Sequence, residues 1–389
     1  MNDLPVPPDH ALALSAQLTE LVRADIKAAG GVLPFSAYME RCLYTPGLGY
    51  YSAGSEIFGS AGDFVTAPEL SVLFGRCLAR PCSQVLERLG GGDILEFGAG
   101  SGALAVDVLG ELELLGCLPD RYLILERSAG LRARQQQRFT EQLPHLQERV
   151  HWLESLPESG FSGVLLANEV LDALPVERFH WTGTGIEQAC VSRDGSGFDW
   201  RWQATQDVAL VAAVNEIQQM CELTPGYCSE INLSIAPWLQ SVAGVIDRGV
   251  LFLCDYGYPR REYYHSQHNR GTLMCHYRHR AHADPFLWPG LQDMTAHVDF
   301  TAVADAAVTA GLDVTGYASQ AGFLLDCDLD VLLQAAGPAQ SPSYIKAAQQ
   351  VKQLTLPGEM GERFAFMGLA RGVDGPLPGF RIQDRRQRL

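Results

Sequence analysis

The sequence lacks the patterns that identify secreted, membrane-spanning and zinc-binding proteins. Its ten cysteines include no Cys-x-x-Cys pair, which argues against a disulfide framework and against a clustered zinc site. No apolar run approaches membrane-spanning length, and the opening MNDLPVPPDH resembles neither a signal peptide nor a transit segment. We therefore expect a cytoplasmic chain without a membrane span.

Positive charge is also scarce. The chain has 29 Lys and Arg against 45 Asp and Glu, a formal net charge of −16. Such a chain would repel a phosphate backbone unless it carried a basic patch, so we expect basic peptides or small molecules as partners and not nucleic acid. At 389 residues with 47% hydrophobic residues, it is long enough for a core domain with additions.

The most informative motif is DILEFGAGSG at residues 93–102, a short apolar strand followed by alternating glycines and a helical run. Without a Cβ, Gly98, Gly100 and Gly102 let the backbone turn sharply from strand to helix and approach a ligand closely. The motif predicts a nucleotide-like cofactor at the carboxyl end of this strand. The alternative is a plain glycine-rich turn.

The identity of the cofactor depends on two carboxylates. Gly98, Gly100 and Ala103 also fit a relaxed dinucleotide fingerprint. Glu96, however, would repel a pyrophosphate and suits S-adenosylmethionine, which carries a sulfonium and an ammonium group. Glu126, which ends the next strand, is placed to accept the ribose hydroxyls of either cofactor. We therefore favour S-adenosylmethionine, and an NAD-dependent dehydrogenase is the weaker alternative.

From residue 93 onward, strand-like and helix-like segments alternate, which predicts a parallel sheet with helices on both faces. Strands are expected near 93–97, 121–126, 149–153, 163–168 and 249–254, and ERFAFMGLA is expected to be a final strand.

Composition and periodicity suggest four consecutive regions. They are an N-terminal helical extension and cofactor lid at 1–75, a core at 76–257 with an inserted β-hairpin near 177–203, an insertion loop on the substrate side at 258–297, and a C-terminal part at 298–389 that completes the sheet. Thr66 and Glu69 have the spacing of a capping box for the following helix, which Pro81 should kink or end.

A second candidate site lies in GVLLANEVLDALPVERF, where an apolar strand ends in Asn168 and Glu169. If the next turn is helical, Glu169 and Asp172 project from one face and form a pair of carboxylates suited to a guanidinium. Asn168 would hold the cofactor or orient the acceptor. The alternative makes Asn168 a turn former and the two acids ordinary residues of a first helical turn.

Histidines gather in the 258–297 region, as His265-x-x-His268 and His276-x-x-His279-x-x-His282. Imidazoles three apart could share a metal ion on a helix. Nearby arginines oppose a divalent cation and no matching acidic set is evident, so we expect no metal site. His279 could touch the substrate.

Several stretches resemble, in the same order, those of the MidA family, bacterial relatives of a mitochondrial complex I assembly factor. They are GDFVTAPELSVLFG, ILEFGAGSG, ILERS, LLANEVLDALPVERF, LFLCDYGYPRREYY and DMTAHVDF, between about Pro34 and Val373. The resemblance implies an α/β, Rossmann-like class I methyltransferase with a mostly parallel seven-stranded sheet, an N-terminal helical extension and insertions. It also implies S-adenosylmethionine as cofactor and methylation of a protein arginine, as in the mitochondrial representative.

The resemblance also implies roles for single residues. Glu96 and the three glycines match the family's cofactor loop, in which ELGPG is common and from which Phe97 and Ala99 depart. The remaining positions are Glu126 for the ribose, Asn168 facing the cofactor, Glu169 and Asp172 facing the acceptor, Asp63, Thr66 and Pro68 as a cover over the cofactor, and Asp255 of the DYG motif as a substrate-site or turn acid.

Three function classes follow. They are a protein arginine methyltransferase, a methyltransferase acting on a small molecule or another side chain, and an adenosyl-binding assembly chaperone with little turnover. Exposed sheet edges or the aromatic hairpin could form a homodimer interface.

Overall fold

The computed structural model describes residues 4–52, 66–195 and 197–389, which form two compact units. The first unit contains the described residues of Met1–Phe64, Leu171–Pro237 and Tyr258–Thr301, and the second those of Val65–Val170, Trp238–Gly257 and Ala302–Leu389. Each unit is made of three separate stretches of the chain. The four regions expected from the sequence stay a prediction. No helix in the described ranges is long and apolar enough to cross a membrane.

The second unit is built on a sheet with the strand order β15-β16-β10-β5-β2-β3-β4. Neighbouring strands from β10 to β4 are parallel, and β16 runs antiparallel to both β10 and β15. The strands are β2 (Asp93–Phe97), β3 (Tyr122–Leu125), β4 (Val150–Leu153), β5 (Phe161–Asn168), β10 (Ile246–Tyr258), β15 (Asp313–Ser319) and β16 (Phe364–Arg371). All six strands expected from the sequence are confirmed within a few residues.

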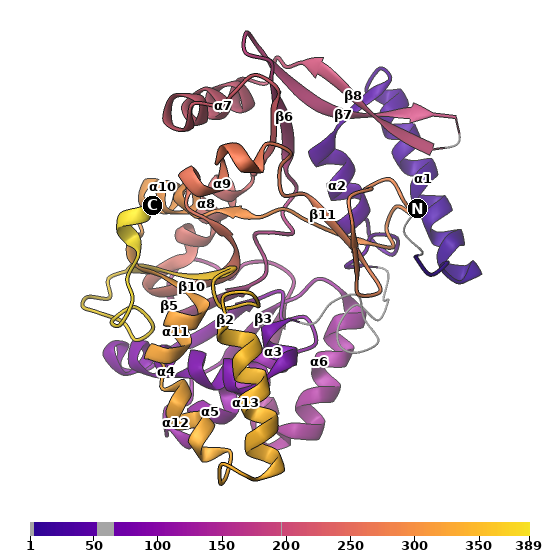
Figure 1. Ribbon diagram of the computed structural model, residues 1–389. Helices are drawn as coiled ribbons and strands as arrows, with labels where there is room; N and C mark the ends of the chain where they lie inside the picture. Colours follow the sequence, from indigo (N-terminus) through magenta and orange to yellow (C-terminus); the bar gives the residue numbers. More distant parts are fainter. Residues whose placement is uncertain (1–3, 53–65, 196) are drawn as a thin grey trace. The chain divides into compact units, whose positions relative to one another are not determined.

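Helices of the second unit cover this sheet and supply much of its core, with α4, α5, α11, α12 and α13 gathered in the lower part of Figure 1. They are α3 (Ala67–Leu70), α4 (Val72–Leu89), α5 (Ala103–Leu114), α6 (Ala129–Gln142), α11 (Gln320–Asp326), α12 (Leu329–Ala335) and α13 (Pro342–Thr355), with short 3-10 turns at Pro144–Arg149 and Arg386–Arg388. The connecting helices α8 (Ile235–Val245) and α10 (Phe300–Thr309) carry residues of both units.

Helix α4 corrects the predicted N-cap and shows that Pro81 does not end the helix. Its N-cap is Ser71, whose hydroxyl accepts a hydrogen bond from the Leu73 amide at 3.3 Å, so the capping box predicted from Thr66 is wrong. Thr66 begins only the short α3, and its side chain makes no capping bond. The helix also continues through Pro81 and ends at Gly90, which has a left-handed φ of 78°.

The first unit has two sheets of its own. The larger has the order β1-β7-β6-β9, with β8 paired to β7, and the smaller has the order β12-β11-β13. The strands of these two sheets are β1 (Val32–Pro34), β6 (Glu177–Trp181), β7 (Ile186–Asp194), β8 (Gly197–Ala204), β9 (Tyr227–Ile231), β11 (Met274–Tyr277), β12 (Arg280–His282) and β13 (Asp293–Thr295). The two-residue strand β14 (Val298–Asp299) belongs to neither of them. The helices are α1 (Asp9–Ala28), α2 (Phe35–Tyr44), α7 (Val208–Cys221), α9 (Arg260–Tyr263) and a 3-10 turn at Ser266–His268.

These sheets extend the architecture expected from the sequence. The described residues form sixteen strands in three sheets, not one mostly parallel sheet of seven strands. The short β11, β12 and β13 lie within the 258–297 segment, which the sequence presented as a loop. The predicted hairpin is part of a larger antiparallel sheet because β1 and β9, distant in sequence, pair with its strands.

Candidate functional site

The glycine loop follows β2 directly. Gly98, Gly100 and Gly102 have φ values of 58°, 54° and 82°, a left-handed region that residues with a Cβ rarely adopt. Gly102 is the N-cap of α5 and donates its amide to the Ala99 carbonyl at 2.7 Å. The loop therefore depends on glycine for its backbone conformation, and it leads into a helix N-terminus whose first amides lack intrahelical partners.

Helix α3 contacts this loop through Glu69, the residue predicted above to form a capping box with Thr66. The Glu69 carboxylate bonds to the Ser101 hydroxyl and forms an ion pair with Arg138 at 3.1 Å. Thr66 and Pro68 lie at the start of the same helix, and Thr66 is buried. Asp63 lies outside the described residues. The role of this segment as a cover over the cofactor stays a prediction.

Glu126 lies beside the glycine loop, and Gln135 joins the two. The Gln135 amide nitrogen donates to the Gly100 carbonyl at 2.9 Å and to the Glu126 carboxylate at 3.3 Å. Its oxygen accepts from the Trp152 indole at 2.8 Å. Burial raises the pKa of Glu126, although the Ser128 amide and Gln135 oppose this by donating to its carboxylate. A carboxylate has about four lone-pair sites, so Glu126 keeps capacity for ribose hydroxyls.

Glu96 is engaged inside the sheet. Its carboxylate is almost fully buried and accepts a hydrogen bond from the Tyr122 hydroxyl of β3 at 2.7 Å. Burial raises the pKa of Glu96 to about 7, against the lowering effect of the Tyr122 hydrogen bond and together with the raising effect of Glu126. The raised pKa favours the neutral carboxyl, which weakens the argument that the charge of Glu96 alone selects a cationic ligand.

The end of β5 presents Asn168 and Glu169. The Glu169 carboxylate accepts from the Asn168 amide nitrogen at 3.1 Å and from the Tyr256 hydroxyl at 3.2 Å. Its backbone amide donates to the Cys254 carbonyl of β10 at 2.8 Å. The Asn168 side-chain oxygen is buried and has no hydrogen-bond partner among the described residues. A buried acceptor without a partner is costly in a folded protein, so this atom fits a ligand N–H or O–H group.

Asp255 lies within strand β10, opposite Ala365 of β16, and not in the turn or helix cap that was the alternative to a substrate role. It is 1% exposed, and its carboxylate accepts from the backbone amides of Val170 at 3.2 Å and Tyr256 at 2.9 Å. These bonds hold the ends of β5 and β10 together. A direct role for Asp255 in catalysis stays a prediction.

The expected helical turn after β5 is absent. Residues 169–174 form bends and a turn, and Glu169 has a left-handed φ of 53°. The argument that Glu169 and Asp172 project from one helical face is therefore wrong. Glu169 belongs to the second unit and Asp172 to the first.

Asp172 lies in an acidic, aromatic part of the first unit. It is 4% exposed, and Asp293 of β13 is 2% exposed. The Tyr51 hydroxyl donates to the Asp293 carboxylate at 2.9 Å. Desolvation, followed by the charges of nearby groups that include Asp293 and Asp172, raises the pKa of Tyr51 well above its ordinary range. The two buried carboxylates therefore share one environment.

The histidine-rich segment brings the His265 and His268 rings to 6.4 Å between centroids. The described ranges contain no group of three or more His, Cys, Asp or Glu residues placed to hold a metal ion. Burial lowers the pKa of His276 and of His282, which favours the neutral rings. His279 lies between β11 and β12 with a left-handed φ of 59°, and its contact with substrate stays a prediction.

The parallel sheet, the glycine loop and the carboxylate on the next strand define an adenosyl-cofactor enzyme. A family model described as "Putative S-adenosyl-L-methionine-dependent methyltransferase" matches residues 77–318. The chain belongs to this family, and it is an S-adenosylmethionine-dependent methyltransferase. The resemblance to the MidA family is thereby confirmed.

Individual relatives agree. The chain is 30% identical to the mitochondrial protein arginine methyltransferase NDUFAF7 homolog of Drosophila melanogaster, over 92% of this chain and 85% of the relative. It is 27% identical to protein arginine methyltransferase NDUFAF7 of Danio rerio, over 88% and 84%. The chain is also similar to a "likely methyl transferase" from Burkholderia thailandensis, crystallised with S-adenosyl-homocysteine. The two are 44% identical, with a TM-score of 0.95 over 100% of both chains. The cofactor is therefore S-adenosylmethionine and not a dinucleotide.

The residues of the second unit fit this cofactor. Gly98, Gly100 and Gly102 supply a backbone turn, Glu126 supplies acceptors for hydroxyls, and the Asn168 oxygen is a buried acceptor open to an N–H group. Sequence reasoning missed Gln135 and Asp293. Gln135 is one of three consecutive glutamines, and Asp293 opens the DMTAHVDF stretch without a flanking motif.

Proposed function

We propose that the enzyme methylates an arginine side chain of a protein, with a respiratory-complex subunit or assembly intermediate as the acceptor. The supporting observation is the Glu169 carboxylate, which Asn168 and Tyr256 hold at the carboxyl end of β5. In open α/β sheets this edge is where ligands bind. The names of the relatives support an arginine side chain as the group that is methylated, since they are protein arginine methyltransferases.

The chemistry explains why a fixed carboxylate matters. The cofactor supplies an electrophilic methyl group when bound. An arginine has a pKa above about 12, so its nitrogen must lose a proton as the new N–C bond forms and the S–C bond breaks. Glu169 can accept a guanidinium N–H, increase the electron density on that nitrogen, and receive the proton. The two donors on Glu169 keep its oxygens oriented for this role.

The test measures the acceptor directly. Extract from a strain lacking the gene is incubated with enzyme and methyl-labelled S-adenosylmethionine, and labelled protein is hydrolysed to identify the modified amino acid. We expect labelled methylarginine. Label in a small molecule or on another side chain would overturn the proposal.

Glu169→Gln tests the role of the carboxylate. Loss of a general base lowers rates by about 10²-fold or more, and we expect this loss with cofactor affinity unchanged. Glu141→Gln, on the exposed side of α6, is the matched control and should label at the normal rate. Near-normal turnover of Glu169→Gln would contradict the mechanism.

A further inference from the structure

The Gln135 side chain is fully buried on α6, and both of its polar atoms are bonded. Its amide nitrogen donates to the Gly100 carbonyl at 2.9 Å and to the Glu126 carboxylate at 3.3 Å. Its oxygen accepts from the Trp152 indole at 2.8 Å. These partners come from the glycine loop, the residue after β3, and β4, and all of them belong to the second unit.

The chemistry of the partners fixes the direction of the Gln135 amide. An indole N–H can only donate, so the atom facing Trp152 must be the amide oxygen. A backbone carbonyl can only accept, so the atom facing Gly100 must be the amide nitrogen. The second hydrogen on that nitrogen is then directed at Glu126. A flipped amide would lose all three hydrogen bonds, and the donor to Glu126 therefore has one stable orientation.

Each carboxylate oxygen of Glu126 accepts from a neutral donor. Oε1 accepts from the Ser128 amide at 2.8 Å, and Oε2 accepts from Gln135. A carboxylate has about four acceptor sites, so Glu126 can take further donors on these oxygens. The adjacent hydroxyls of a ribose are donors of the kind that an acid in this position binds.

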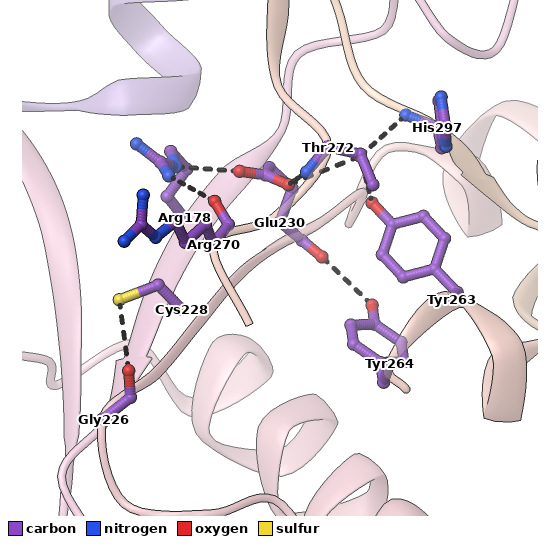
Figure 2. A network of polar contacts seen from close by, with 9 residues as sticks. All are labelled: Arg178, Gly226, Cys228, Glu230, Tyr263, Tyr264, Arg270, Thr272 and His297. Carbon is purple, nitrogen blue, oxygen red and sulfur yellow. Dashed lines mark hydrogen bonds and ion pairs between the residues drawn. The ribbon is translucent and has the colours of Figure 1, made fainter. Parts of the chain in front are cut away.

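Glu230 in the first unit is a buried carboxylate of a different kind, shown in Figure 2. Its Oε1 pairs with Arg178 at 2.8 Å, and its Oε2 accepts from the Thr272 amide at 2.6 Å. A guanidinium of the chain itself thus neutralises the Glu230 charge. The donors to Glu126 described above are neutral amides, which orient its oxygens without neutralising them. Glu126 is therefore the carboxylate suited to a ligand.

We propose that Gln135 is a positioning residue of the cofactor site, which orients the Glu126 carboxylate so that it accepts both ribose hydroxyls of S-adenosylmethionine. Trp152 and Gly100 fix the Gln135 amide, and its remaining N–H fixes one oxygen of Glu126. A glutamate side chain without such a donor would lose rotamer freedom on binding, which lowers affinity. The inference concerns the cofactor and does not depend on the identity of the methyl acceptor.

The test uses Gln135→Met in the full-length protein. Methionine is unbranched, suits a buried helical position, and lacks the amide. Calorimetry measures the affinities for S-adenosyl-homocysteine and for its analogue without the two ribose hydroxyls. We expect the first affinity to fall about tenfold, the effect of one hydrogen bond to a charged group, and the second to change less than about twofold. An equal fall for both ligands, or no fall for either, would overturn the proposal.

Gln137→Met is the matched control. Gln137 lies two residues further along α6, is exposed, and donates its side-chain amide to the Glu141 carboxylate at 2.8 Å. The change removes the same kind of bond from the same helix, away from the glycine loop. We expect both ligands to bind this variant as they bind the wild type. A loss specific to the ribose hydroxyls in Gln137→Met would overturn the assignment to Gln135.

Trp152→Phe reaches the same amide from its other side. It removes the indole donor and keeps an aromatic ring, so the Gln135 amide can turn away from Glu126. We expect the affinity for S-adenosyl-homocysteine to fall about threefold, with the affinity for the analogue unchanged. A ratio of the two affinities equal to that of the wild type would contradict the fixed amide on which the proposal depends.

Glu126→Gln tests the group that Gln135 orients. It should lower the affinity for S-adenosyl-homocysteine by about tenfold or more and leave the analogue unaffected. Adding Gln135→Met should then cause no further loss specific to the ribose hydroxyls, because the oriented group is already gone. An undiminished loss in the double variant would overturn the positioning role. Normal affinity in Glu126→Gln would overturn the ribose role of Glu126 and the inference with it.

Discussion

The two units build their polar sites in different ways. In the second unit, polar groups lie at the ends of three strands of one sheet. The glycine loop follows β2, Glu126 follows β3, and Asn168 ends β5. The left-handed glycines set the backbone of the loop itself. In the first unit, the Asp172 turn is held by Tyr44, Asn232 and Ala296, which are far apart in the sequence. The first kind of site depends on local conformation, and the second depends on long-range side-chain contacts.

Because of this difference, we expect the loss of one buried side chain to lower the free energy of unfolding more in the first unit than in the second. Glu230 is fully buried, bonded to Arg178 and Thr272, and also accepts from Tyr264 through its carbonyl. Glu230→Gln should lower the free energy of unfolding of the first unit by about 3–5 kcal/mol, because it leaves the Arg178 charge without its carboxylate. Denaturant unfolding followed by first-unit tryptophan fluorescence would measure this loss.

Cofactor binding by the same variant provides the contrast. Calorimetric affinity for S-adenosyl-homocysteine should stay unchanged in Glu230→Gln under native conditions. Glu187→Gln is the matched control, because Glu187 forms a more exposed pair with His180 in the same sheet and its loss should cost less than about 1 kcal/mol. Loss of cofactor affinity in Glu230→Gln would break the comparison.

The second unit should instead show a pH dependence centred on Glu96. Its pKa is raised to about 7 in the folded state, from an ordinary value near 4.5. The folded state thus binds the proton more tightly than the unfolded state, so this stabilising contribution is complete below about pH 4.5 and disappears as the pH rises through 7. Glu96→Gln should remove about 3 kcal/mol of the fall in unfolding free energy between pH 4.5 and 8.

Denaturant titrations across this pH range would measure the effect as the difference between wild type and variant. Asp107→Asn is the control, because burial also raises the pKa of Asp107 to about 7 and that variant should retain the Glu96 contribution. Identical pH profiles for wild type and Glu96→Gln would show that the Glu96 carboxylate is better solvated than its burial indicates.

The smallest effect concerns the glycine loop. Gly102→Val forces a left-handed φ on a β-branched residue, and its Cβ would lie 3.2 Å from Gln135. The strain, about 1–2 kcal/mol, favours another loop conformation in the free protein, and ligand binding must reverse that change, so affinity for S-adenosyl-homocysteine should fall about five- to thirtyfold by calorimetry. Gly110→Ala is the control in the same helix, where nothing lies within 4 Å of a new Cβ, and it should bind normally. Normal binding by Gly102→Val would mean that the loop tolerates another conformation.

Local patterns predicted much of the second unit. The strands before Gly98 and before Glu126 were found because an apolar run and a following turn are visible within about ten residues. The same kind of reasoning failed at Thr66, where Ser71 five residues later caps the long helix instead. It also failed after Glu169, because a left-handed residue ends the strand where a helix was expected. Each failure reflects a choice between neighbouring turn residues that tertiary packing decides.

The sequence by itself determined that this chain has a strand-to-helix glycine loop with a carboxylate on the next strand, because those features depend on backbone conformations that only certain residues adopt. Only the tertiary structure decided that Gln135 joins the glycine loop to Glu126, that Glu96 bonds to Tyr122, and that Tyr44, Asn232 and Ala296 meet at the Asp172 turn. The physical reason is that such contacts join residues as many as 129 positions apart in the sequence. No local pattern records which distant side chain will supply a hydrogen bond.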